Sequence, residues 1–151
     1  IHLEYARAGA DILTTNTFSA NALKLARHGL ADKVKEINRA GVRLAREAGA
    51  GSCWIAGLVG PPGQDVEGVS TDGLEAIYSQ QISVLLESGV DLLLFEGFGH
   101  LPTLKLVVEL ARRLAGPNVA IACGVDIEPN HKTRFGDDGA AIGRALAAMP
   151  A

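Results

Sequence analysis

Hydrophobic residues gather in four short runs that are spaced at intervals along the chain. These runs occupy residues 12–13, 54–59, 92–95 and 119–123, and nearly every position within them is apolar. Strands that are buried on both faces have this composition, whereas a strand with one solvated face alternates apolar and polar residues. The pattern therefore predicts four strands of a parallel sheet that is covered by helices.

Longer segments with apolar residues at every third or fourth position lie around these runs. They cover residues 2–8, 33–48, 74–85, 102–111 and 142–149, and this spacing predicts amphipathic helices. Asp72, with Glu75 three residues later, is expected to form the capping box at the start of the third helix. Pro102 suits the first turn of the fourth helix, where its missing N–H costs nothing.

One local pattern recurs at intervals of about 40 residues. Residues 8–18 read AGADILTTNTF and residues 88–98 read SGVDLLLFEGF, with weaker versions that start at residues 48–50 and 115–118. Each time a helical pattern ends near a glycine, the usual left-handed terminator, and an apolar run follows almost at once. Repeats of strand, helix and tight return predict successive βα units.

The repeat predicts an α/β fold with about four βα units of parallel sheet, which is part of a (β/α)8 TIM barrel. The chain has no dinucleotide-binding fingerprint, although a doubly wound sheet stays open as an alternative. Residues 1–151 are expected to be the central portion of one such domain, truncated at both ends, because the sequence begins and stops beside helical patterns. The long connections, residues 60–71 and 125–138, follow strands, and in parallel α/β folds the site lies on such loops.

Polar side chains follow two of the apolar runs, where strand is expected to become loop. Thr15, Asn16 and Thr17 come directly after the first run, and they suit either a small ligand or the capping of local backbone groups. Glu96 ends the third run, and a carboxylate there needs a salt-bridge partner or a cationic ligand. Asn16 and Glu96 occupy equivalent places in the repeat. They are therefore expected at matching heights, in a small polar pocket that suits the charged groups of an amino acid.

Other candidate groups carry less information. The glycine- and proline-rich residues 57–63 suit either an anion-binding loop or a rigid turn. The histidines share no metal-ligand spacing and are expected to be surface or capping residues; they are His2, His28, His100 and His131. Cys53 is expected at the start of a strand, at the end of the barrel opposite to the site, and Cys123 in the core. Two such distant cysteines do not form a zinc motif.

Composition and charge exclude several functional classes. The chain has 151 residues, of which 48% are hydrophobic and 21% charged, which is typical of one globular domain. A net charge of −3 argues against nucleic acid or an anionic membrane surface as a partner. No apolar run is long enough for a membrane span, and no secretory signal is visible. Two isolated cysteines are typical of a reducing compartment, so a cytoplasmic location is expected.

Three motifs in order, AGADILTTNTFSAN, IAGLVGPPG and GVDLLLFEGF, resemble the homocysteine S-methyltransferase family over nearly all of the chain. The resemblance implies a (β/α)8 barrel and methyl transfer to the sulfur of homocysteine, which gives methionine. It also implies a zinc ion, held by three cysteines, that binds the substrate thiolate. Glu96 stands where the family's glutamate takes the substrate amino group, and Thr15 where a threonine holds its polar end.

The chain also departs from the family pattern. Cys53 and Cys123 match neither of the family's zinc-ligand segments, so no metal ligand is assigned, and the zinc cysteines are expected outside this chain. Gly97 follows Glu96 where many relatives have threonine. The sequence thus predicts a partial homocysteine S-methyltransferase domain, inactive in isolation, with no catalytic residue assigned. Glu96, Thr15 and Asn16 are its expected substrate contacts.

The methyl donor is left open among methyltetrahydrofolate with cobalamin, S-methylmethionine and betaine. Two other functions stay open as well. One is another amino-acid- or carboxylate-handling TIM-barrel enzyme with Glu96 as acid or base, and the other is a non-catalytic half-barrel that serves as an assembly module.

Overall fold

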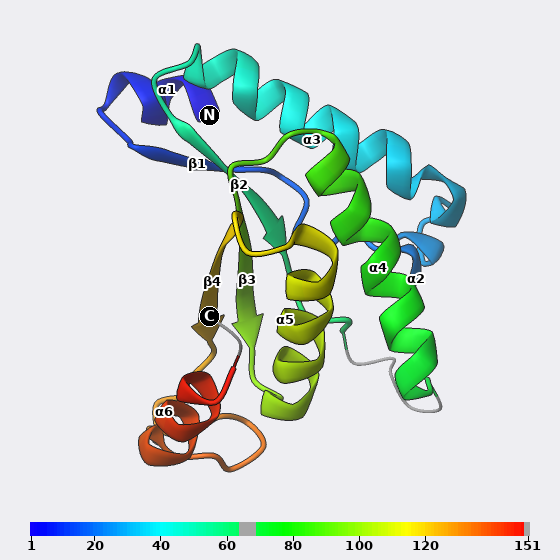
Figure 1. Ribbon diagram of the computed structural model, residues 1–151, viewed down its shortest axis with the longest axis vertical. Coiled ribbons are helices and arrows are strands. Elements are labelled where there is room, and N and C mark those ends of the chain that lie inside the picture. Colours follow the sequence, from blue (N-terminus) through cyan, green and yellow to red (C-terminus); the bar gives the residue numbers. More distant parts are fainter. Residues whose placement is uncertain (64–68, 150–151) are drawn as a thin grey trace.

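The computed structural model describes residues 1–63 and 69–149, in which four parallel strands form one sheet (Figure 1). The strands are β1 (Ile12–Thr14), β2 (Trp54–Val59), β3 (Leu92–Phe98) and β4 (Ala120–Val125), and their order in the sheet is their order in the chain. A doubly wound sheet reverses direction at a switch point, and this order has none. The predicted α/β class with four parallel βα units is confirmed.

Helices cover one face of this sheet and extend beyond its carboxyl end. They are α1 (His2–Arg7), α2 (Ala22–Ala26), α3 (Val34–Gly49), α4 (Thr71–Glu87), α5 (Leu101–Ala115) and α6 (Gly139–Ala147), with a short 3-10 turn, η1 (Ala31–Lys33). In Figure 1, α3, α4 and α5 lie side by side along the sheet, and α6 lies beyond the carboxyl end of β4. The five helices that periodicity predicted are confirmed, whereas α2 and η1 were not predicted because they are too short to show a period.

The hydrophobic core fills the space between the sheet and these helices. Ile55 and Leu93 from the sheet and Ile82 and Leu104 from the helices are all fully buried. On the opposite face of the sheet, no described helix covers the strands, and Trp54 is 64% exposed. The expectation that the strands are buried on both faces is therefore met on the helix side only.

Strand β3 is longer than the apolar run that predicted it. It continues from Leu92 to Phe98, with a register irregularity against β4 between Phe95 and Phe98. Gly97, with φ of 77°, supplies the left-handed backbone that such an irregularity requires. Glu96 therefore lies within β3, close to its carboxyl end, rather than beyond the strand.

The start of α4 differs from the predicted capping box. Ser70 is the N-cap, and its hydroxyl accepts a hydrogen bond from the Gly73 N–H at 3.1 Å. The prediction of Asp72 as the cap was wrong because Ser70 is an equally good cap that stands two residues earlier. Asp72 instead lies in the first turn, where a carboxylate interacts favourably with the helix dipole.

Candidate functional site

The two buried threonines at the end of β1 bind to β2. Thr15 and Thr17 are each 1% exposed, and their hydroxyl oxygens lie 2.6 Å apart. Thr17 donates to the Leu58 carbonyl at 2.7 Å, and the Leu58 N–H donates to Thr15 Oγ1 at 3.0 Å. Because the Thr17 proton is used on Leu58, Thr15 is the donor within the pair. Both hydroxyls thus extend the pairing of β1 with β2, and the expectation that Thr15 touches substrate stays a prediction.

Asn16 points to the opposite side of the strand. Successive side chains of a strand alternate between faces, and Asn16 is exposed while Thr15 and Thr17 are buried. It therefore lies on the face of the sheet that the described helices leave open.

A buried amide network holds the loop that follows these residues. Gln81 Nε2 donates to the Thr17 carbonyl at 2.8 Å, and Asn38 Nδ2 donates to the Ala20 carbonyl at 2.7 Å. Gln81 and Asn38 are fully buried and contact each other at 3.3 Å. Helices α3 and α4 thus fix the position of the loop after Asn16. The sequence analysis did not single out Gln81; the signal was an amide at a core-facing position of the helical pattern at residues 74–85.

Glu96 is exposed on the same open face as Asn16. Its side chain passes over Gly124 of β4, and it makes no hydrogen bond or ion pair to any residue of the described chain. The alternative of a structural salt bridge to a neighbouring strand is therefore not seen among residues 1–63 and 69–149. A carboxylate without a protein partner at the carboxyl end of a strand is available to a ligand.

The sheet register relates Asn16 to Glu96. Ala56 pairs with both Thr14 and Leu92, so hydrogen bonding relates β1 and β3 by 78 positions, whereas the sequence repeat relates them by 80. In an eight-stranded barrel with a shear of eight, residues at the same height along the barrel axis are offset from the hydrogen-bond register by about one position per strand. The difference between 78 and 80 is two positions over the two steps from β1 to β3, which equals this offset. The register is thus compatible with Asn16 and Glu96 in one layer, and their shared pocket stays a prediction.

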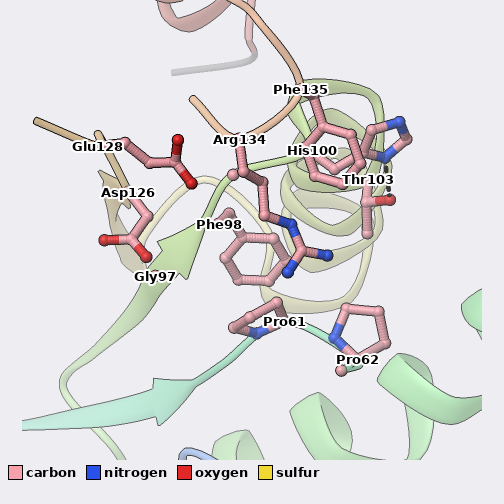
Figure 2. A pocket seen from close by; sticks show the side chains of 12 residues that line it. Pro61, Pro62, Gly97, Phe98, His100, Thr103, Asp126, Glu128, Arg134 and Phe135 are labelled. Atoms are coloured by element: carbon pink, nitrogen blue, oxygen red, sulfur yellow. Dashed lines mark hydrogen bonds between the residues drawn. The ribbon is translucent and has the colours of Figure 1, made fainter. Parts of the chain in front are cut away.

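A cavity of about 310 Å³ lies at the carboxyl ends of β2, β3 and β4 (Figure 2). It is lined by residues 61–63 after β2, by residues 97–100 and Thr103 at and after the end of β3, and by Asp126, Glu128, Arg134 and Phe135 after β4. This is the end of the sheet at which the long loops predicted a site. Glu96, Thr15 and Asn16 do not line the cavity, although Gly97 does.

The cavity wall after β4 is a loop organised by Thr133. This side chain is 1% exposed, accepts hydrogen bonds from the Phe135 and Asp137 N–H groups at 3.2 Å each, and donates to the Asp137 carboxylate at 3.0 Å. The loop therefore presents Arg134 and Phe135 from a fixed turn. The sequence analysis did not single out these residues; the length of the 125–138 connection was the signal.

The loop after β2 contributes prolines to the cavity. The Gly60 N–H donates to the Phe18 carbonyl at 3.1 Å, and a side chain at Gly60 would meet that oxygen at 2.7 Å. This N–H is therefore not available to an anion, which favours the rigid turn over the anion-binding loop. Residues 64–68 of the same connection lie outside the described residues.

The histidines and Cys53 lie where the sequence suggested, whereas Cys123, which was expected in the core, is only half-buried. His100 is exposed at the N-cap position of α5, and its Nδ1 lies 2.7 Å from Thr103 Oγ1. Cys53 directly precedes β2, and its thiol donates to the Ala10 carbonyl at 3.1 Å. Burial raises the pKa of the half-buried Cys123 thiol. Within residues 1–63 and 69–149, no three His, Cys, Asp or Glu side chains gather as metal ligands.

No helix of the described residues combines the length and the apolar character that a membrane-spanning helix requires.

Comparison with known proteins identifies relatives of this chain. A family model described as homocysteine S-methyltransferase matches residues 1–151. Betaine–homocysteine S-methyltransferase 1 of Danio rerio is 31% identical over 126 residues, which are 82% of this chain and 32% of the relative. S-methylmethionine–homocysteine S-methyltransferase BHMT2 of Mus musculus is 32% identical over 124 residues, 82% of this chain and 33% of the relative. The chain thus spans about a third of the length of these curated relatives.

A solved structure supports the same relationship. The homocysteine methyltransferase MmuM from Escherichia coli, in its oxidized form, matches with a TM-score of 0.83 and 27% identity. The match covers 99% of this chain and 57% of that chain. Its apo form matches with a TM-score of 0.74 and 26% identity. The arrangement of the βα units is therefore shared with this enzyme over nearly the whole chain.

Proposed function

Because the chain belongs to the homocysteine S-methyltransferase family, we propose that the whole protein transfers a methyl group to the sulfur of homocysteine and forms methionine. The family match over residues 1–151, the two methyltransferase relatives and the similarity to MmuM support this reaction. The proposal applies to the whole protein, since this chain corresponds to part of each relative.

Within this proposal, Glu96 binds the ammonium group of homocysteine. The supporting observation is a carboxylate near the carboxyl end of an otherwise apolar strand, with no hydrogen-bond or ion-pair partner in the described chain. A hydrogen bond between two charged groups is among the stronger ones in proteins, so this residue dominates the proposed contact. Asn16, which is exposed on the open face just after β1, is proposed to complete the polar end of the substrate site. Thr15 faces the helices with its hydroxyl bound to β2, so its proposed part is to hold this strand end in place.

The methyl donor is proposed to be betaine or S-methylmethionine, which the named relatives use, or methyltetrahydrofolate with cobalamin. The family's zinc does not fit the described residues, because Cys53 directly precedes β2, Cys123 lies within β4, and no third ligand gathers with them in this part of the chain. The proposal therefore places the zinc ligands outside the printed sequence. We also propose a cytoplasmic location for the protein, which the two unpaired cysteines support.

The test is a methyl-transfer assay on the whole protein. It is incubated with L-homocysteine and each of the three donors in turn, and methionine is measured by mass spectrometry, with binding of homocysteine measured by calorimetry. Methionine formed with one donor supports the proposal. Homocysteine binding without turnover would favour a binding or assembly role, and neither binding nor turnover would overturn the proposed function.

A further inference from the structure

The cavity at the carboxyl ends of β2, β3 and β4 carries opposite charges on its wall. Arg134 supplies a guanidinium group, and Asp126 and Glu128 supply carboxylates. None of the three forms an ion pair with another or with any residue of the described chain. In Figure 2 the Arg134 side chain extends into the space between Phe98 and the two prolines, while Asp126 and Glu128 lie to one side of it.

The Arg134 side chain is exposed, and it packs against the half-exposed ring of Phe135 and against Gly99. The Arg134 guanidinium carbon lies 4.8 Å from the centre of the Phe135 ring, and the side-chain stem passes so close to Gly99 that an added Cβ there would meet its Cγ at 3.4 Å. Stacking on an aromatic ring leaves the N–H groups at the edge of the guanidinium plane free to bind a carboxylate with two parallel hydrogen bonds. The turn built on Thr133 fixes the backbone from which Arg134 extends.

We propose that this cavity binds a small zwitterion, and that Arg134 binds its carboxylate. Asp126 and Glu128 then face the cationic end of the ligand, because complementary charges on a cavity wall select the orientation of a charged ligand. The apolar wall of Phe98, Pro61 and Pro62 suits the carbon chain between the two ends. The inference rests on the proposed function for the identity of the ligand, since homocysteine, betaine and S-methylmethionine all carry a carboxylate and a cationic group on a short carbon chain, with an additional sulfonium in S-methylmethionine. For homocysteine this position is separate from the one proposed at Glu96, which does not line the cavity.

The test uses the full-length protein with Arg134→Met and Arg134→Lys. Each zwitterion is compared by calorimetry with its analogue that lacks the carboxylate: homocysteine with 3-aminopropane-1-thiol, betaine with tetramethylammonium, and S-methylmethionine with 3-(dimethylsulfonio)propylamine. Arg134→Met is expected to weaken binding of at least one zwitterion by about 10- to 100-fold and to leave its analogue unchanged. Arg134→Lys, which keeps the charge but not the paired hydrogen bonds, is expected to fall between.

Arg43→Met is the control, because Arg43 is an exposed residue of α3 that pairs with Glu47 on the same helix. It removes the same charge and is expected to change no affinity. An equal loss for a zwitterion and its analogue in Arg134→Met would indicate disturbed packing and would overturn the proposal. Unchanged affinity for all three zwitterions, or a wild-type protein that binds none of them, would overturn it as well. Normal methionine formation with no effect of Arg134→Met would reject this inference while leaving the proposed function intact.

Discussion

At the scale of single residues, neighbours in the sequence have separate tasks. Thr15 and Thr17 face the helices and bind β2, whereas Asn16 faces the open side of the sheet. One polar cluster thus combines strand-end capping with an exposed polar side chain. Residue type alone indicates that such side chains can cap local backbone groups. The direction of each side chain depends on where the strand begins to pair.

We expect Thr15→Val to destabilise the protein by about 1–3 kcal/mol, because the partly buried Leu58 N–H loses its acceptor. Urea denaturation measures this loss, and Thr14→Val, an exposed position on the open face, is expected to change stability by less than about 0.5 kcal/mol. If Thr15 also contacts homocysteine, as the family resemblance implies, the substrate affinity falls by about fivefold. A loss of stability with unchanged affinity would remove Thr15 from the substrate site.

We expect Glu96→Gln in the full-length protein to weaken homocysteine binding by about 10- to 100-fold, since a charge-assisted hydrogen bond becomes a neutral one. Stability and zinc content are expected to stay unchanged, because the side chain is exposed and makes no internal bond. Glu109→Gln is the control, because it removes a partly exposed carboxylate of α5 that pairs with Lys105 on the same helix. Unchanged affinity by calorimetry in Glu96→Gln would show that this carboxylate does not hold the substrate.

At the scale of elements, α3 packs closely against the end of β1. Gly41 is buried in this contact, and a Cβ at this position would lie 2.6 Å from the Thr17 methyl group. We expect Gly41→Ala to destabilise the protein by about 1–3 kcal/mol through overpacking, although alanine favours helix. Gly143→Ala in α6 is the control, because nothing lies within 4 Å, and it is expected to be neutral or slightly stabilising. Equal effects of the two changes in thermal unfolding would contradict this account of the contact.

The start of β3 is joined to β2 and α3 by one carboxylate. Asp91 accepts a hydrogen bond from the Ile55 N–H at 2.6 Å and lies 2.9 Å from Arg46. Burial opposes its ionisation, but these hydrogen bonds and the charge of Arg46 hold the pKa of Asp91 below its usual value. A lowered pKa in the folded state stabilises the protein above the unfolded pKa of about 3.9, and this stability is lost as the pH falls through the folded value.

We therefore expect Asp91→Asn to cost about 1–2 kcal/mol of unfolding free energy at pH 7, and the difference from wild type to shrink below about pH 4. Urea denaturation at several pH values measures both. Glu47→Gln, which removes an exposed carboxylate of α3, is expected to cost less than about 0.5 kcal/mol. A difference that stays constant from pH 7 to pH 3 would assign the effect of Asp91→Asn to packing instead of charge.

At the scale of the whole molecule, the described sheet has two unpaired edges and one uncovered face. β1 pairs only with β2 and β4 only with β3, and Ile12 and Trp54 are 50% and 64% exposed. Open strand edges and exposed apolar surface promote association. We expect residues 1–151 expressed alone to dimerise or aggregate, to bind no stoichiometric zinc and to transfer no methyl group.

Sedimentation velocity, metal analysis and the methyl-transfer assay test this expectation, with the full-length protein as the control. A monodisperse monomer with one bound zinc and turnover would contradict both the open sheet and the cysteine argument. A well-behaved, metal-free and inactive dimer would instead favour the assembly module that the sequence analysis left open.

The sequence by itself determined the βα order, the strand positions within a few residues and the end of the sheet that carries the long loops. These features follow from local periodicity and from glycines at helix ends, which act between neighbours in the chain. Only the tertiary structure decided that Gln81 holds the loop after β1 and that Arg134 reaches a cavity beside Phe98. Gln81 and Arg134 act on residues far away in the sequence, and such contacts depend on sheet register and helix docking, which no local pattern specifies.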